Sequence, residues 1–119
     1  MKSEIKFDIK KRTFILSLEI IKLLKCLDGT YIAQTIGKQL LRAATSIGAN
    51  IFEAQSAPSK KDFANFFSIA LKSANETLYW LALLKSAKLV NPDKIDELFS
   101  ETQEICKIIA KSLITMRGK

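Results

Sequence analysis

Apolar residues recur along the chain in four long stretches, each with the spacing of one face of a helix. We expect helices over residues 8–27, 31–55, 60–87 and 92–116. The short breaks between them are rich in Gly, Pro, Ser and Asn, which is typical of turns. Long helices with short links predict an all-α fold, an antiparallel up-down-up-down four-helix bundle in which residues 1–119 form a single domain.

The breaks also hold residues that favour helix ends. Gly29 is expected to end the first helix in the left-handed backbone conformation. Thr30 and Ser59 are expected to cap the second and third helices, and Asn91 with Pro92 starts the fourth.

The first predicted helix is apolar on two nearly opposite sides. Phe14, Leu18 and Ile21 lie on one side, and Leu16 with Ile20 lies on the other. A helix that is hydrophobic nearly all round must be covered twice, and the simplest second cover is another subunit. We therefore expect a homo-oligomer. The candidate interface residues are Leu16, Ile20, Leu23, Leu27, Ile69, Trp80 and Leu83.

A line of polar residues runs beside the apolar stripe of the second helix, which extends from Ile32 to Ile51. The line keeps within an arc of roughly 80° at about 100° per residue. It is either the solvent edge of the helix or a buried seam whose members satisfy one another. Small neighbouring residues favour the seam, because they allow close helix approach. Glu76 in the third helix would then need a partner, for which Arg42 is the candidate. The predicted structural seam comprises Gln39, Arg42, Ser46, Asn50, Glu53, Ser73 and Glu76, and we expect it to fix helix register and subunit orientation.

A net charge of +7, from 19 basic and 12 acidic residues, favours attraction to a polyanion and also aids solubility. The basic segment 1–12 is either a solvated lead-in or an arm that faces phosphates. The chain has no sequence-reading helix, zinc finger or RNA-binding sheet motif, so nucleic-acid contact should be led by phosphates, sensitive to salt and weakly specific. The candidate nucleic-acid-binding residues are Lys6, Lys10, Lys11, Arg12, Lys22, Arg117 and Lys119.

The chain offers little reaction chemistry. It has no His, which excludes a zinc site built from Cys and His and a Cys–His nucleophile. Cys26 and Cys106 are expected to be reduced thiols in or near the core. Glu53 and Glu76 could act as acid and base, but no histidine base or phosphate-cradling glycine loop accompanies them. We therefore expect a protein that is not an enzyme and that uses neither a metal nor a cofactor.

The location of the protein is predicted from its apolar runs. The sequence contains no run of 18 apolar residues, and the segment Met1–Arg12 is charged throughout, without the apolar centre of a signal peptide. We expect a cytoplasmic protein that does not enter a membrane.

Two linked motifs resemble those of a known family. R-A-A-T-S-I-G-A-N-I-F-E at Arg42–Glu53 and F-F-S-I-A-L-K-S-A-N-E at Phe66–Glu76 are similar to the paired patterns of the 23S rRNA intervening-sequence four-helix-bundle family. The matching positions are Arg42, Ala44, Ser46, Ile47, Asn50, Ile51, Glu53, Ile69, Ala70, Ser73 and Glu76. The family's Glu-Gly is Glu53-Ala54 here, so we expect the second helix to continue past Glu53.

The resemblance implies an antiparallel four-helix bundle and a ring-shaped pentamer. It also implies kinship with accessory proteins of diversity-generating retroelements, which bind nucleic acid and reverse transcriptase through basic surfaces. Two functions stay open at this point. The first is a basic oligomeric bundle that binds RNA, DNA or a nucleoprotein, and the second is an adaptor that recognises an acidic protein partner without nucleic acid.

Overall fold

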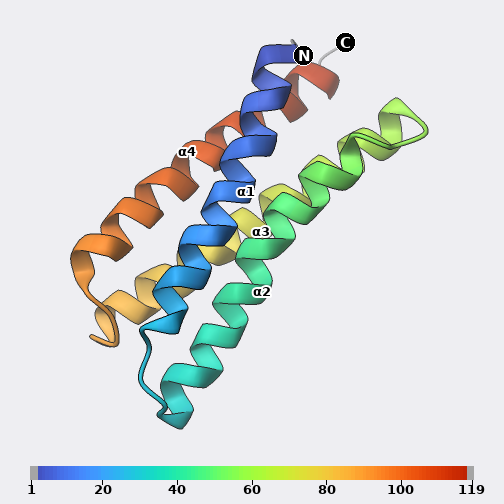
Figure 1. Ribbon diagram of the computed structural model, residues 1–119. Helices are drawn as coiled ribbons and strands as arrows, with labels where there is room; N and C mark the ends of the chain where they lie inside the picture. Colours follow the sequence, from blue (N-terminus) through green and yellow to red (C-terminus); the bar gives the residue numbers. More distant parts are fainter. Residues whose placement is uncertain (1–2, 118–119) are drawn as a thin grey trace.

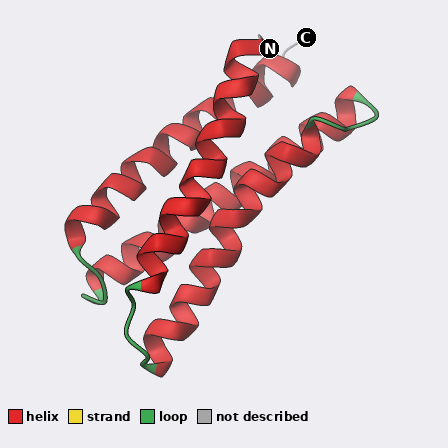
Figure 2. Ribbon diagram, in the orientation of Figure 1, coloured by secondary structure: helices red, strands yellow, loops and turns green. Residues whose placement is uncertain are grey.

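The computed structural model describes residues 3–117, with side chains from Asp8 onwards. Four helices follow one another along the chain: α1 (Ser3–Lys25), α2 (Tyr31–Ala54), α3 (Lys60–Ser86) and α4 (Pro92–Arg117). They lie side by side in an elongated bundle of 48 × 22 × 20 Å (Figure 1). Helices and loops make up the whole of residues 3–117, with no strand (Figure 2).

The helix ends follow from local side chains. The Thr30 hydroxyl accepts a hydrogen bond from the Ala33 N–H at 3.3 Å, and the Ser59 hydroxyl accepts one from the Asp62 N–H at 3.1 Å. The Asn91 side chain accepts from the N–H of residue 93 at 2.8 Å. All three predicted caps are therefore confirmed, because each satisfies an amide that the first helical turn leaves free.

The largest differences from the predicted helix boundaries are at the two ends of α1. Helix α1 begins at Ser3 instead of residue 8, and it ends at Lys25 instead of residue 27. Ile9, in the second turn of the described helix, is fully buried in the core. Helix α2 continues past Glu53, as expected, but only to Ala54.

The left-handed backbone conformation occurs at a position that the sequence did not predict. No glycine among residues 3–117 has a positive φ, so the prediction for Gly29 is wrong. Lys88, after α3, has φ 60°. The Leu89 N–H turns back to the Leu84 carbonyl at 3.1 Å, which closes the helix end in the way usually built on a glycine.

The core lies along the axis between all four helices. Its largest fully buried side chains are Phe67, Ile9, Leu16, Ile20, Leu40, Ile47, Ile51, Leu81, Leu84, Ile95, Ile105 and Ile109. The expected apolar stripe of α2 is confirmed from Leu40 to Ile51, whereas Ile32, in the first turn of α2, is exposed.

Two glycines of α2 let α1 approach closely. A Cβ atom on Gly48 would lie 3.3 Å from the backbone oxygen of Thr13. A Cβ atom on Gly37 would lie 3.4 Å from the Leu24 side chain of α1 and 2.9 Å from the tip of Leu27, in the loop that follows α1. These approaches fix where α1 crosses α2, which determines what surface the two helices present together.

Neighbouring helices meet with opposite residue order. On α2 and α3, Arg42 contacts Glu76 while Ser46 contacts Ser73. On α1 and α4, Arg12 pairs with Glu101, and Glu19 pairs with Lys94. In both pairs of helices the residue number rises along one helix and falls along its neighbour.

Candidate functional site

The predicted interface side of α1 is buried within the single chain. Leu16, Ile20 and Leu23 all lie in the core, so their assignment to a subunit interface is wrong. The opposite side of the helix faces outward, with Phe14 65% exposed and Leu18 44% exposed. Both sides of α1 carry large apolar residues in the sequence, so only the packing of the helix shows which side faces α2 and α4.

The other predicted interface residues are more accessible. Ile69 on α3 is exposed, while Leu27, Trp80 and Leu83 are half-buried. Tyr79, beside Trp80, is exposed as well. Exposed apolar side chains therefore occur on α1, α2 and α3, and Ile114 is exposed on α4.

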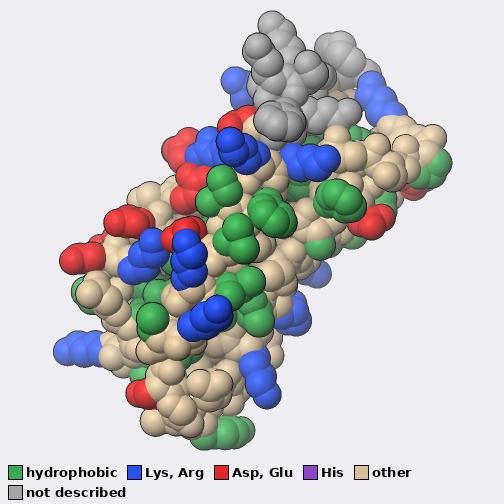
Figure 3. Space-filling view, in the orientation of Figure 1, with side chains coloured by type: hydrophobic (Ala, Val, Ile, Leu, Met, Phe, Trp, Pro, Cys, Tyr) green, Lys and Arg blue, Asp and Glu red, His purple; other side chains and the backbone are tan. Residues whose placement is uncertain are grey.

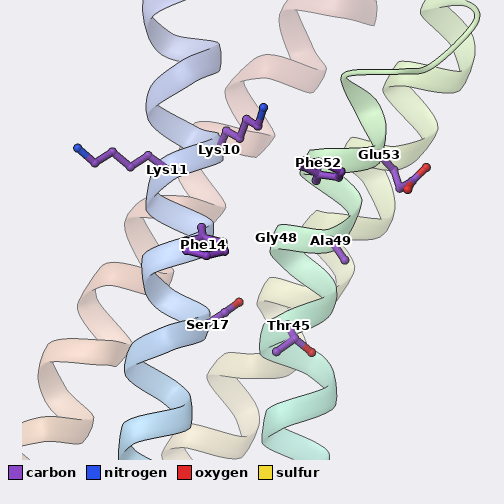
Figure 4. Close-up of a pocket in the computed structure, with 9 residues that line it drawn as sticks. All are labelled: Lys10, Lys11, Phe14, Ser17, Thr45, Gly48, Ala49, Phe52 and Glu53. Carbon is purple, nitrogen blue, oxygen red and sulfur yellow. The ribbon is translucent and has the colours of Figure 1, made fainter.

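A groove runs between the exposed sides of α1 and α2 (Figure 4). It has a volume of about 640 Å³. Phe14 of α1 and Phe52 of α2 stand at its walls, and Thr45, Gly48 and Ala49 of α2 are small residues along it. Figure 3 shows apolar side chains gathered on this face, with basic side chains on both flanks. The α1–α2 groove, as we call it, is lined by Lys10, Lys11, Phe14, Ser17, Thr45, Gly48, Ala49, Phe52 and Glu53.

Two of the predicted nucleic-acid-binding residues stand at one end of the α1–α2 groove. The Lys10 ammonium lies 5.3 Å from the centroid of the Phe52 ring, a cation–π contact between the two helices. Both Lys10 and Lys11 are exposed, and neither has an ion pair with another residue between 8 and 117. Glu53 also lines this end but points away from α1 (Figure 4). The groove thus ends in two available positive charges.

Arg12 has a different role from these lysines. Its guanidinium donates two hydrogen bonds to the Glu101 carboxylate, at 2.9 and 2.8 Å, and lies 3.6 Å from Asp8. The Glu101 hydrogen bond raises the pKa of Arg12. A bidentate pair of this kind joins α1 to α4, so Arg12 is bound within the chain rather than free for phosphate.

Lys22 and Arg117 do not gather with Lys10 and Lys11. Lys22 pairs with Glu19 at 3.3 Å, roughly 18 Å along α1 from Lys10 at 1.5 Å per residue. Arg117 donates to the Ser68 hydroxyl of α3 at 2.7 Å. The side chains of Lys6 and Lys119 lie outside the described residues.

Lys94 on α4 forms a contact with α1 that the sequence did not predict. Its ammonium lies 2.8 Å from the Glu19 carboxylate, and this hydrogen bond is the main cause that lowers the pKa of Glu19. No sequence pattern links residues 75 positions apart, so only the fold reveals this contact.

The polar seam forms between α2 and α3. The hydroxyls of Ser46 and Ser73 are hydrogen-bonded at 2.8 Å, and the Asn50 amide donates to the Ser46 hydroxyl at 3.1 Å. The predicted pairing of Arg42 with Glu76 is confirmed. These contacts join the middle turns of the two helices.

The seam is enclosed at its centre and open at one end. Ser73 is buried, whereas the side chains of Arg42 and Glu76 are 56% and 33% exposed. The Trp80 indole N–H donates to Glu76 at 3.0 Å and is the largest cause that lowers the pKa of Glu76. Gln39 accepts from Arg42 at 3.0 Å. Glu53 is exposed and lines the α1–α2 groove, so its assignment to an enclosed seam is wrong.

Both cysteines are free thiols. Cys106 is half-buried, and burial raises the pKa of its thiol, whereas Cys26 is exposed instead of lying in or near the core. Between residues 3 and 117, His, Cys, Asp and Glu form no group that could hold a metal ion. None of the helices in this part of the chain is long and apolar enough to cross a membrane.

Comparison with known proteins places this arrangement in a family. The family profile described as 23S rRNA-intervening sequence protein matches residues 6–111, so the chain belongs to that family. A crystal structure of a protein of unknown function, from the S23 ribosomal protein family of Bacteroides thetaiotaomicron, is similar to this chain, with a TM-score of 0.86 and 36% sequence identity. The similarity covers 92% of this chain and 97% of that one. No functionally curated protein matches the chain.

Proposed function

We propose that this protein is a non-enzymatic, basic helical bundle that binds RNA or DNA through phosphate contacts from its lysines. The observation that carries the proposal is the placement of Lys10 and Lys11, exposed and without an ion pair among residues 8–117, at the end of the α1–α2 groove. Unpaired lysines attract phosphates at little cost, because no existing ion pair has to break. The net charge of +7 adds a general attraction to polyanions.

Self-association forms the second part of the proposal. The order of contacts between helices supports an antiparallel up-down-up-down bundle, and the family resemblance suggests a ring-like homo-oligomer, a pentamer. Leu18 and Ile21 on α1 and Leu41 on α2 are exposed beyond the groove, whereas Ile69 and Tyr79 are exposed on α3. Different apolar surfaces on one chain favour head-to-tail contacts, which generate rings when the rotation closes.

The alternative is an adaptor that recognises an acidic protein partner. The same two lysines beside an apolar groove suit an acidic helix as well as phosphates. A reverse transcriptase as protein partner, and a cytoplasmic location, stay predictions.

The test is binding of mixed-sequence RNA and DNA, followed by fluorescence anisotropy across a salt series. We expect binding at low salt that weakens steeply as salt rises. Reversal of both lysines, in the variant K10E/K11E, should weaken binding to all sequences. The matched control is K60E/K61E, which reverses another adjacent pair of exposed lysines with no ion pair among the described residues. Equal losses in both variants would show that net charge alone matters, and no binding at low salt would favour the adaptor.

A further inference from the structure

We propose that the α1–α2 groove binds single-stranded nucleic acid by stacking a base on Phe14 or Phe52 while Lys10 and Lys11 hold the adjoining phosphates. This inference rests on the proposed function. It adds that the nucleic acid is single-stranded and names the aromatic rings and lysines that bind it.

Two exposed aromatic rings stand at the α1–α2 groove. Phe14 is 65% exposed and Phe52 is 62% exposed, and they come from different helices. Every base has a flat face that stacks on an aromatic ring, so exposed rings beside a basic patch form a platform that accepts any sequence.

The groove also has space beside the two rings. Thr45, Gly48 and Ala49 carry small side chains, and the groove volume of about 640 Å³ falls within the usual range for small-molecule sites. Gly48 has little room for a larger side chain because α1 approaches closely, and a Cβ atom there would lie 3.3 Å from the Thr13 backbone oxygen. The two helices therefore touch at Gly48, one of the residues that line the groove.

Positive charges lie at one end of the groove. Lys10 leans toward α2, whereas Lys11 extends from the other side of α1, and Glu53 points away (Figure 4). The Lys10 ammonium lies 5.3 Å from the centroid of the Phe52 ring. A base that stacks on this ring displaces the ammonium toward the phosphate beside it, so the cation exchanges a weak ring contact for a full negative charge.

These features favour a single strand over a duplex. Duplex bases are stacked on one another and offer no free face to a ring, so a duplex uses only the lysines. An acidic helix or a second copy of this chain would also cover the aromatic rings, and the experiment separates both from the single strand.

The experiment compares a 12-nucleotide single strand of uridines with a mixed-sequence duplex of the same length at low salt, by fluorescence anisotropy. We expect F14L/F52L to bind the single strand about tenfold more weakly and the duplex as before, because Leu keeps the apolar contact and loses the stacking face. The control is Y31L, which changes an exposed aromatic residue outside the groove and should leave both affinities unchanged. Equal binding of the single strand by F14L/F52L and the unaltered protein would overturn the inference.

A second measurement uses a single strand with 5-iodouracil, which photo-crosslinks to an aromatic ring in contact with the base. Crosslinks at Phe14 or Phe52 are expected, and crosslinks confined to other residues would overturn the inference even if F14L/F52L assembles differently.

A poly-glutamate peptide serves as a probe for an acidic protein partner. If F14L/F52L binds this peptide more weakly but binds the single strand as before, the groove is assigned to an acidic partner. If F14L/F52L has a changed molecular mass in solution but binds the single strand as before, the groove is assigned to a second copy of this chain. If duplex binding persists in either of these two cases, the proposed function stands. If the unaltered protein binds neither the single strand nor the duplex, both the inference and the proposed function are wrong.

Discussion

The ammonium of Lys10 on α1 lies 5.3 Å from the centre of the Phe52 ring on α2. A positive charge from one helix and an aromatic face from another thus meet at one end of the α1–α2 groove. This relationship depends on how closely the two helices cross, which makes the crossing itself open to test.

The variant G48A should be less stable than the unaltered protein by about 1 kcal/mol. Overpacking against the Thr13 backbone costs about 1–3 kcal/mol, and removal of a glycine from a helix returns only about 0.5–1 kcal/mol. Urea unfolding measures the difference. The control is G37A, whose Cβ atom would meet the movable tip of Leu27, so we expect a smaller change. A higher midpoint for G48A would mean that α1 shifts freely across α2.

The variant K88G should be more stable by about 0.5–1 kcal/mol. Lys88 has φ 60°, a conformation that costs a residue with a Cβ atom about 1–2 kcal/mol, and the extra freedom of glycine in the unfolded chain offsets part of the gain. Thermal unfolding is the measurement. The variant K88A removes the same side chain and keeps the strain, so stabilisation by alanine as large as by glycine would contradict this explanation.

The variant E76Q should lose stability that depends on pH. The Trp80 and Arg42 hydrogen bonds lower the pKa of Glu76, so the folded state favours the carboxylate. This contribution is present above the unfolded pKa, near 4.5, and is lost as the pH falls through the folded pKa. Because the pair is partly exposed, we expect at most about 0.5 kcal/mol at pH 7. Urea unfolding of both proteins at pH 7 and pH 3 should give a difference that shrinks in acid. If the free energies of unfolding of the two proteins differ equally at both pH values, the Glu76 carboxylate does not stabilise the fold through these contacts.

Substitution of opposite sides of α1 should have different effects. The variant L18E/I21E places charges on exposed apolar positions, so light scattering should show a lower mass than that of the unaltered protein, with helix content retained. The variant L16A removes a buried side chain and should cost about 2–5 kcal/mol of stability. A change of mass in L16A alone, without loss of stability, would restore Leu16 to the subunit interface.

The helices and their caps could be predicted because they depend on neighbouring residues. Ser59 lies three positions before the amide it satisfies, and the Arg42–Glu76 pair follows from helical spacing on two adjacent helices. The orientation of α1 could not be predicted, because Phe14 and Leu16 lie on sides that both carry large apolar residues. Local pattern favoured Gly29 over Lys88 for the left-handed position, but the path of each loop decides that conformation.

The candidate site was only partly predictable for the same reason. Lys10 and Lys11 stand out by charge alone, but Arg12 looks identical in sequence until Glu101, 89 residues away, is brought beside it. Gly48, which lines the groove, meets Thr13 in a contact between helices that no local pattern encodes.

The most direct test of phosphate binding at the groove is the salt dependence of single-strand affinity in the unaltered protein and in K10E/K11E. The slope of log affinity against log salt measures how many phosphates the protein neutralises, about 0.7 per contact for a single strand. We predict that the slope becomes shallower by about 1.4 when both lysines are reversed. An unchanged slope would show that Lys10 and Lys11 contact no phosphate and would contradict the account.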